Sequence, residues 1–174
     1  MNIILSKSSA TCTREIIQVD INPKNAVHLK LILIYRNPRI TAAENDAFYT
    51  MMKEILISQH ECVIMGDFNL PNIDWTLQRP TPAPGNKLMQ LLADNNLTQH
   101  VHETIRQKNI LDIVISTEEE LIVNLKITNK IGDHQAITFS IKTEKGIRKK
   151  YSIRKKPDNF RRVNFDGMRT VFDY

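Results

Sequence analysis

The chain has 174 residues, of which 41% are hydrophobic, so it can form one globular domain with a sizeable core but has little room for a second. Its apolar runs are far shorter than the roughly 20 residues that span a bilayer and no secretory signal is visible, so we expect no membrane partner and an intracellular location, nuclear or cytoplasmic. The net charge of +5 is uneven, because residues 142–174 hold 11 Lys and Arg against 4 Asp and Glu, whereas residues 1–141 hold 13 against 15.

The first half of the chain reads as strand, strand, helix, strand. Residues 15–21 alternate like a half-buried strand, and residues 27–35 form the Ile- and Leu-rich run of a central strand. A helix is predicted from Thr41, because Thr41 and Glu44 have the spacing of a capping box and residues 48–56 carry an apolar stripe. Residues 62–65 predict a short buried strand, in which Cys62 would be a reduced, buried thiol.

The second half begins with a long loop and ends in strands. Four prolines and Trp75 fall within residues 70–85, which predicts a stiffened surface loop. A helix is predicted over about residues 86–95, with Asn95 and Asn96 as a left-handed stop. Strands are predicted at 111–115, 121–128 and 134–141. The apolar pattern then ends, so we expect the domain to occupy residues 1–141 and a basic linker to occupy residues 142–174.

Polar residues gather at the ends of the predicted strands. The four clusters are residues 35–38, 66–69, 109–112 and 132–134. Where strand ends converge on one edge of a sheet, such clusters form a single pocket. A carboxylate placed directly after a buried strand is costly unless a cation or hydrogen-bond donors satisfy it. For each cluster alone, the alternative is that Asp and Asn only cap turns.

The clusters suggest a site for a hard cation. Asp67 and Asp133 are the expected ligands of Mg²⁺ or Mn²⁺, and Asn69 adds a neutral oxygen or an amide donor. His134 and Asp133 point to opposite sides of an extended backbone, so only one of them can reach the cation directly. Asp112 could accept an imidazole N–H from His134 and thereby orient the ring.

Other reaction classes lack their motifs. The sequence has no Gly-x-Ser-x-Gly elbow, no phosphate-binding Gly-rich loop, no dinucleotide fingerprint and no Cys/His zinc spacing. His100 and His102 have strand spacing, but no third ligand follows at a suitable distance along the chain.

In this order, the four clusters resemble the second half of the endonuclease/exonuclease/phosphatase family, and particularly the apurinic-like endonuclease domain of non-LTR retrotransposons. The resemblance covers residues 1–141, and residues 142–174 are similar to the basic connector that leads to a reverse transcriptase in such elements. It implies an α/β fold, a four-layer αββα sandwich that is partial here. It also implies cleavage of a DNA phosphodiester with Mg²⁺ or Mn²⁺.

The resemblance further implies roles for individual residues. Asp67 and Asn69 would position the attacking water and the phosphate. His134, oriented by Asp112, would stabilise the pentavalent phosphate or assist proton transfer. This assignment agrees with in-line displacement, in which charge on the non-bridging oxygens is met by metal and donors.

Two further residues and two departures complete the comparison with the family. Asp133 would help to hold the metal, and Tyr35 would donate a hydrogen bond to phosphate. Gly132 stands where the family usually has Ser. The family's first strands, which bring an Asn and a metal-binding Glu, are expected before residue 1, so we expect little nicking by this chain alone. A phosphatase or RNA exonuclease of the same fold and a non-catalytic nucleic-acid-binding remnant stay open as alternatives.

Overall fold

The computed structural model describes residues 2–7, 14–22, 28–57, 60–75, 79–80, 83–102, 109–131 and 134–142. The predicted basic linker lies outside them except for Lys142, so its boundary stays a prediction. No described helix has the length and apolar character needed to cross a bilayer.

A six-stranded sheet forms the centre of the molecule. Its strands, in spatial order, are β1 (Asn2–Lys7), β2 (Arg14–Asn22), β3 (Leu29–Arg36), β4 (Glu61–Asp67), β8 (Asp112–Ser116) and β7 (Thr98–Gln99). Only the β3–β4 pair is parallel, and helix α1 (Ala42–Ile57) connects these two strands. Parallel neighbours require such a crossover. The predicted strand, helix, strand unit is therefore confirmed.

The predicted capping box starts α1. The Thr41 N–H donates to Glu44 Oε2 at 2.9 Å, and the Glu44 N–H donates to Thr41 Oγ1 at 3.3 Å. These two bonds satisfy backbone donors that the first helical turn leaves without partners.

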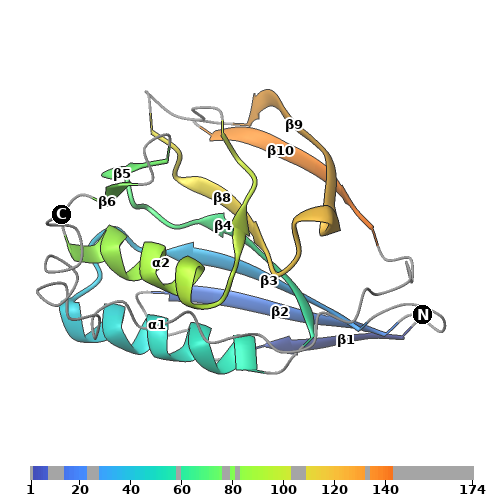
Figure 1. Cartoon of the computed structure of the whole chain (residues 1–174), viewed down its shortest axis with the longest axis horizontal. Helices are drawn as coiled ribbons and strands as arrows, with labels where there is room; N and C mark the ends of the chain where they lie inside the picture. The colour runs from blue at the N-terminus through green and yellow to red at the C-terminus, as the bar shows by residue number, and fades with distance from the viewer. Residues whose placement is uncertain are drawn as a thin grey trace, which may run out of the picture.

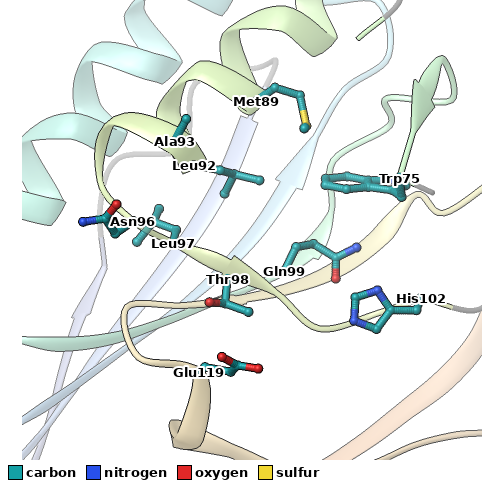
Figure 2. Close-up of a pocket in the computed structure, with 10 residues that line it drawn as sticks. All are labelled: Trp75, Met89, Leu92, Ala93, Asn96, Leu97, Thr98, Gln99, His102 and Glu119. Atoms are coloured by element: carbon teal, nitrogen blue, oxygen red, sulfur yellow. The ribbon is translucent and has the colours of Figure 1, made fainter. Parts of the chain in front are cut away.

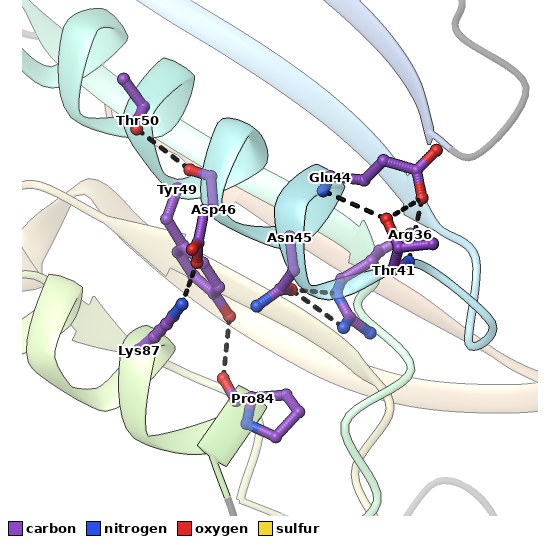
Figure 3. A network of polar contacts seen from close by, with 9 residues as sticks. All are labelled: Arg36, Thr41, Glu44, Asn45, Asp46, Tyr49, Thr50, Pro84 and Lys87. Carbon is purple, nitrogen blue, oxygen red and sulfur yellow. Dashed lines mark hydrogen bonds and ion pairs between the residues drawn. The ribbon is translucent and has the colours of Figure 1, made fainter.

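Helix α2 (Ala83–Asp94) begins earlier than the sequence predicts, because Pro84 is tolerated in the first turn of a helix. It ends at the predicted left-handed stop, where Asn96 has a φ of 50° and the Leu97 N–H donates to Leu92 O at 2.9 Å. Tyr49 Oη donates to Pro84 O at 3.2 Å and Lys87 forms an ion pair with Asp46, so the first turns of α2 are joined to the first half of α1 (Figure 3).

Short strands occupy part of the predicted long loop. They are β5 (Ile73–Asp74) and β6 (Arg79–Pro80), which pair with each other. Further along, the 3-10 turn η1 (Glu119–Leu121) leads into β9 (Ile122–Ile131), which forms an antiparallel ribbon with β10 (His134–Ile141).

The described elements form three layers (Figure 1). Helices α1 and α2 lie side by side on one face of the six-stranded sheet, and the β9–β10 ribbon lies on the other side. The two faces of the sheet differ in burial at β3: Ile32 and Ile34 on one face are fully buried, whereas Leu33 and Tyr35 on the other face are 47% and 45% exposed. The α/β class and the two sheets that the sequence predicts are confirmed.

Candidate active site

Three predicted site residues converge beside the sheet. Strands β4 and β8 are antiparallel and place Asp67 directly opposite Asp112, so both side chains point to the same face. His134 opens β10, and its Nδ1 lies 2.8 Å from Asp112 Oδ2. One ligand atom from each of Asp67, Asp112 and His134 lies within 4.8 Å of the others. We call these three residues the acid–histidine cluster; no other group of three such residues occurs in the described part of the chain.

Gly66 allows the chain to enter this cluster. Its φ of 133° is a conformation that residues with a side chain rarely adopt. A Cβ at this position would lie 1.9 Å from the carbonyl oxygen of Ile34 on β3. Strands β3 and β4 are therefore too close for any side chain at Gly66, and this close approach sets the backbone directly before Asp67.

A tight turn then fixes the Asp67 carboxylate. The Asn69 backbone N–H donates to Asp67 Oδ1 at 2.9 Å, and Asn69 Nδ2 donates to Asp67 Oδ2 at 3.0 Å. Asn69 has a φ of 48°, which Asn tolerates better than most residues. Its Nδ2 also donates to Arg36 O at 2.9 Å. Because both partners of this amide are acceptors only, its nitrogen must face them.

Burial raises the pKa of the Asp67 carboxyl above its ordinary value. The backbone N–H of Asn69 opposes this shift, nearby Asp112 adds to it, and His134 opposes it. Two carboxylates held this close favour a positive partner. His134 supplies one when it is protonated, and a divalent cation would supply a stronger one.

The side chain of Arg36 lies on the face of the sheet opposite to the acid–histidine cluster, although the sequence predicts one shared pocket. The sequence places it in one polar cluster with Tyr35, but consecutive strand residues point to opposite faces. Arg36 is only 3% exposed and extends toward α1, where its Nε and Nη2 donate to Asn45 Oδ1 at 3.2 and 3.0 Å (Figure 3). Its Nη1 donates to Phe68 O at 3.2 Å and to Asn69 O at 3.4 Å. Burial lowers the pKa of the guanidinium, which nevertheless remains charged.

The remaining predicted site residues have different outcomes. Tyr35 is the register partner of Asp67 and projects to the same face, where it is half-exposed. Asp133 and Gly132 lie outside the described residues, so the metal role of Asp133 stays a prediction. Asp112 was expected only to orient His134, yet its position also makes it a potential metal ligand.

A pocket of about 490 Å³ lies elsewhere, between α2 and the edge strand β7 (Figure 2). Met89 and Leu92 form part of its apolar wall, and His102 and Glu119 line its polar side. The Trp75 indole nitrogen is buried and has no hydrogen-bond partner among the residues that the structure describes. None of the acid–histidine cluster lines this pocket.

Comparison with known proteins places the fold. Residues 29–138 match the family model described as endonuclease-reverse transcriptase. An endonuclease/exonuclease/phosphatase family protein from Leptotrichia buccalis C-1013-b superposes with a TM-score of 0.52 and 16% identity, over 81% of this chain and 60% of that one. The human Nocturnin catalytic domain with bound sulfate anion gives a TM-score of 0.43 and 12% identity, over 80% and 59%. No curated protein matches the sequence.

The likeness to the Leptotrichia structure confirms the predicted fold as a partial endonuclease/exonuclease/phosphatase sandwich. The chain spans 60% of the length of that structure.

Proposed function

The chain belongs to the endonuclease-reverse transcriptase family, and we propose that its acid–histidine cluster hydrolyses phosphodiester bonds in DNA with the help of a divalent cation. The family's fold is that of nuclease- and phosphatase-type hydrolases. The observation that carries the proposal is the meeting of Asp67, Asp112 and His134 where β4 ends and where β8 and β10 begin.

The donor set fits a hard cation. Mg²⁺ and Mn²⁺ prefer carboxylate oxygens, and Asp67 offers one that is oriented by two hydrogen bonds from Asn69. Asp112 lies close enough to share the ion. When bound, the cation would supply Lewis-acid stabilisation of the charge on the phosphate oxygens.

The hydrogen bond between His134 and Asp112 determines which ring nitrogen can act. A carboxylate can only accept, so the Nδ1 of His134 carries the hydrogen in this contact. In the neutral ring, Nε2 is then the basic nitrogen. This atom would take a proton from the attacking water or, in the protonated ring, meet negative charge on the phosphate. Tyr35, on the same face, would add a hydroxyl donor to the phosphate.

Plasmid nicking tests the proposal. Supercoiled DNA is incubated with an excess of the chain and Mg²⁺ or Mn²⁺, and Mn²⁺ binding is measured in parallel. In line with the little nicking expected of this chain alone, we expect weak, cation-dependent nicking that falls by about 10² to 10⁴-fold in His134→Ala, the range for loss of a general acid or base. His60→Ala is the matched control, because His60 is exposed and stacks on His28. A chain that neither nicks nor binds Mn²⁺ would overturn the proposal, as would full activity in His134→Ala.

Two small substrates separate the chemical classes. Bis(p-nitrophenyl) phosphate is a diester and p-nitrophenyl phosphate is a monoester. We expect the diester to be the better substrate. A clear preference for the monoester would instead support the phosphatase alternative within the same fold.

The DNA partner is proposed from charge. Residues 142–174 carry a surplus of seven positive charges, from 11 basic against 4 acidic residues. Lys and Arg that neutralise phosphates release counterions, so binding weakens as salt rises. We expect deletion of residues 142–174 to flatten the salt dependence of DNA affinity, and an unchanged slope in a fluorescence titration would show that this segment does not contact phosphates.

A further inference from the structure

Arg36 holds Asn69 at two separate points. Its guanidinium Nη1 donates to the Asn69 carbonyl at 3.4 Å and to the Phe68 carbonyl at 3.2 Å. Its own backbone carbonyl accepts from Asn69 Nδ2 at 2.9 Å. One residue therefore restrains both the backbone and the side chain of Asn69.

Asn69 passes this restraint to the Asp67 carboxylate. Each oxygen of Asp67 accepts one hydrogen bond from Asn69, one from the backbone and one from the side-chain amide. The left-handed backbone of Asn69 is strained relative to ordinary conformations and persists only where its surroundings fix it. The orientation of Asp67 therefore depends on contacts that begin on the opposite side of the sheet.

The other edge of the guanidinium is anchored on α1. Asn45 Oδ1 accepts from both Nε and Nη2, and the Asn45 residue is 6% exposed. The acceptors bonded to this buried cation are thus neutral, an amide oxygen and two carbonyls. Burying a charge without an opposite charge is costly, and an apolar side chain of similar volume would avoid that cost. The arrangement makes physical sense if the fork geometry of Arg is needed to bind several acceptors at once.

We propose that Arg36 is a positioning residue for the Asp67–Asn69 turn, with Asn45 as its anchor on α1. An effect of Arg36 on catalysis rests on the proposed function, whereas its effect on the position of the Asp67–Asn69 turn does not depend on that function. Helix α1 thereby takes part in ordering the site without touching the acid–histidine cluster.

The side-chain amide of Asn69 reports this positioning directly. Both of its hydrogens are donated, so in ¹⁵N-labelled protein its exchange with solvent should be slowed about tenfold or more relative to the exposed Asn96. The NMR signal of this amide is identified by its absence from the spectrum of the Asn69→Asp variant. In Arg36→Lys the charge is kept but the fork is lost, and we expect most of this protection to disappear.

A pair of substitutions at the anchor tests the same idea if Arg36→Lys fails to fold. Asn45→Asp keeps an acceptor for Nε and Nη2 and adds a counter-charge, so the slow exchange of the Asn69 amide should be retained. Asn45→Ala removes the acceptor, so the protection should be lost. Thr41→Ala is the control for general weakening of α1, because it breaks the capping box without touching Arg36, and it should leave the Asn69 amide protected.

The effect of the same substitutions on catalysis is measured with the nicking assay. With the chain in excess, the nicking rate at saturating protein stands for kcat, and the protein concentration that gives half this rate stands for KM. We expect Asn45→Ala to lower kcat about tenfold or more with little change in KM, and Asn45→Asp to restore it. Protection that follows this pattern in a wild-type chain that neither nicks nor binds Mn²⁺ would refute the proposed function and leave the positioning intact. Equal amide protection and equal kcat in Asn45→Ala, Asn45→Asp and the wild type would overturn the positioning role.

Discussion

One face of the six-stranded sheet is built in two different ways across its width. On β8, Val114 and Ser116 are 2% and 1% exposed. They share the face of Asp112, which His134 of the β9–β10 ribbon contacts. On β2 and β3, the register partners Ile17 and Leu33 are 43% and 47% exposed on the same face. We call the β4–β8 part the covered half and the β2–β3 part the open half.

The comparison shows that strand alternation alone does not decide burial. Both halves place apolar residues on this face, Val63 and Val114 in the covered half and Ile17 and Leu33 in the open half. Only the covered half has a second layer against it. The acid–histidine cluster lies in the covered half, where two layers meet and charges are partly shielded from water. Tyr35 lies at the border, beside Asp67 in register yet 45% exposed.

The largest expected effect comes from Gly66→Ala, which would break the covered half. A Cβ there would collide with Ile34 O, a backbone atom that cannot move without separating β3 from β4. We expect a loss of about 4 kcal/mol or more in the free energy of unfolding, measured by urea denaturation. Gly85→Ala is the comparison with a smaller expected loss, because its Cβ would meet side-chain atoms of Ile73, the nearest at 2.9 Å, rather than backbone, and because α2 favours Ala. An unchanged urea midpoint in Gly66→Ala would contradict the strand geometry.

A matched pair of truncations measures the difference between the halves. Val114→Ala should lower the free energy of unfolding by about 2 kcal/mol, from lost apolar burial and the remaining cavity. Leu33→Thr removes more apolar volume but from a half-exposed position, so its cost should stay under about 1 kcal/mol. Equal losses in the two variants would mean that another layer covers Leu33 in solution.

The smallest effect concerns pH at the edge of the covered half. Burial lowers the pKa of His100, and nearby His102 adds to the shift. The Ser116 hydroxyl donates to Glu118 O, so the Nε2 of His100, 2.7 Å from Ser116 Oγ, is the donor in that contact. Since the unfolded chain then binds a proton more readily than the folded one, stability should fall as pH drops below about 6.5. His100→Gln should reduce the difference between urea midpoints at about pH 8 and about pH 5. An identical difference in the variant would exclude His100 as its source.

Local burial patterns explain which elements could be predicted. Helices α1 and α2 carry a period of 3.6 and β2 carries a period of two, whereas β4 and β8 are short apolar runs that are buried on both faces. The two-residue strands β5, β6 and β7 depend on backbone pairing with a distant partner, so no period marks them. Strand β1 was not predicted, because its apolar residues form one short run at residues 3–5 with no alternation around it.

Some residues of the candidate site could be predicted from local sequence patterns, and others could not. The meeting of Asp67, Asp112 and His134 followed from polar residues at the ends of buried strands. The role of Arg36 did not, because its partners Asn45 and Phe68 lie on a helix and a turn whose positions the local pattern does not encode. The signal that could have found Asn45 is its place on the buried stripe of α1, where a polar residue requires a partner.

The register between β4 and β8 also has a consequence for the order of folding. Strands β2, β3 and β4 are joined by short connections or by α1, whereas Asp67 meets Asp112 only after a segment of about 45 residues has closed. Contacts across such distances form late, since the entropy of closing the segment is lost before the pairing compensates for it. A chain folded only as far as β4 would hold the Asp67–Asn69 turn without the second carboxylate. The complete acid–histidine cluster would thus appear only when β8 and the β9–β10 ribbon dock, which keeps partly folded chains from forming the proposed active site.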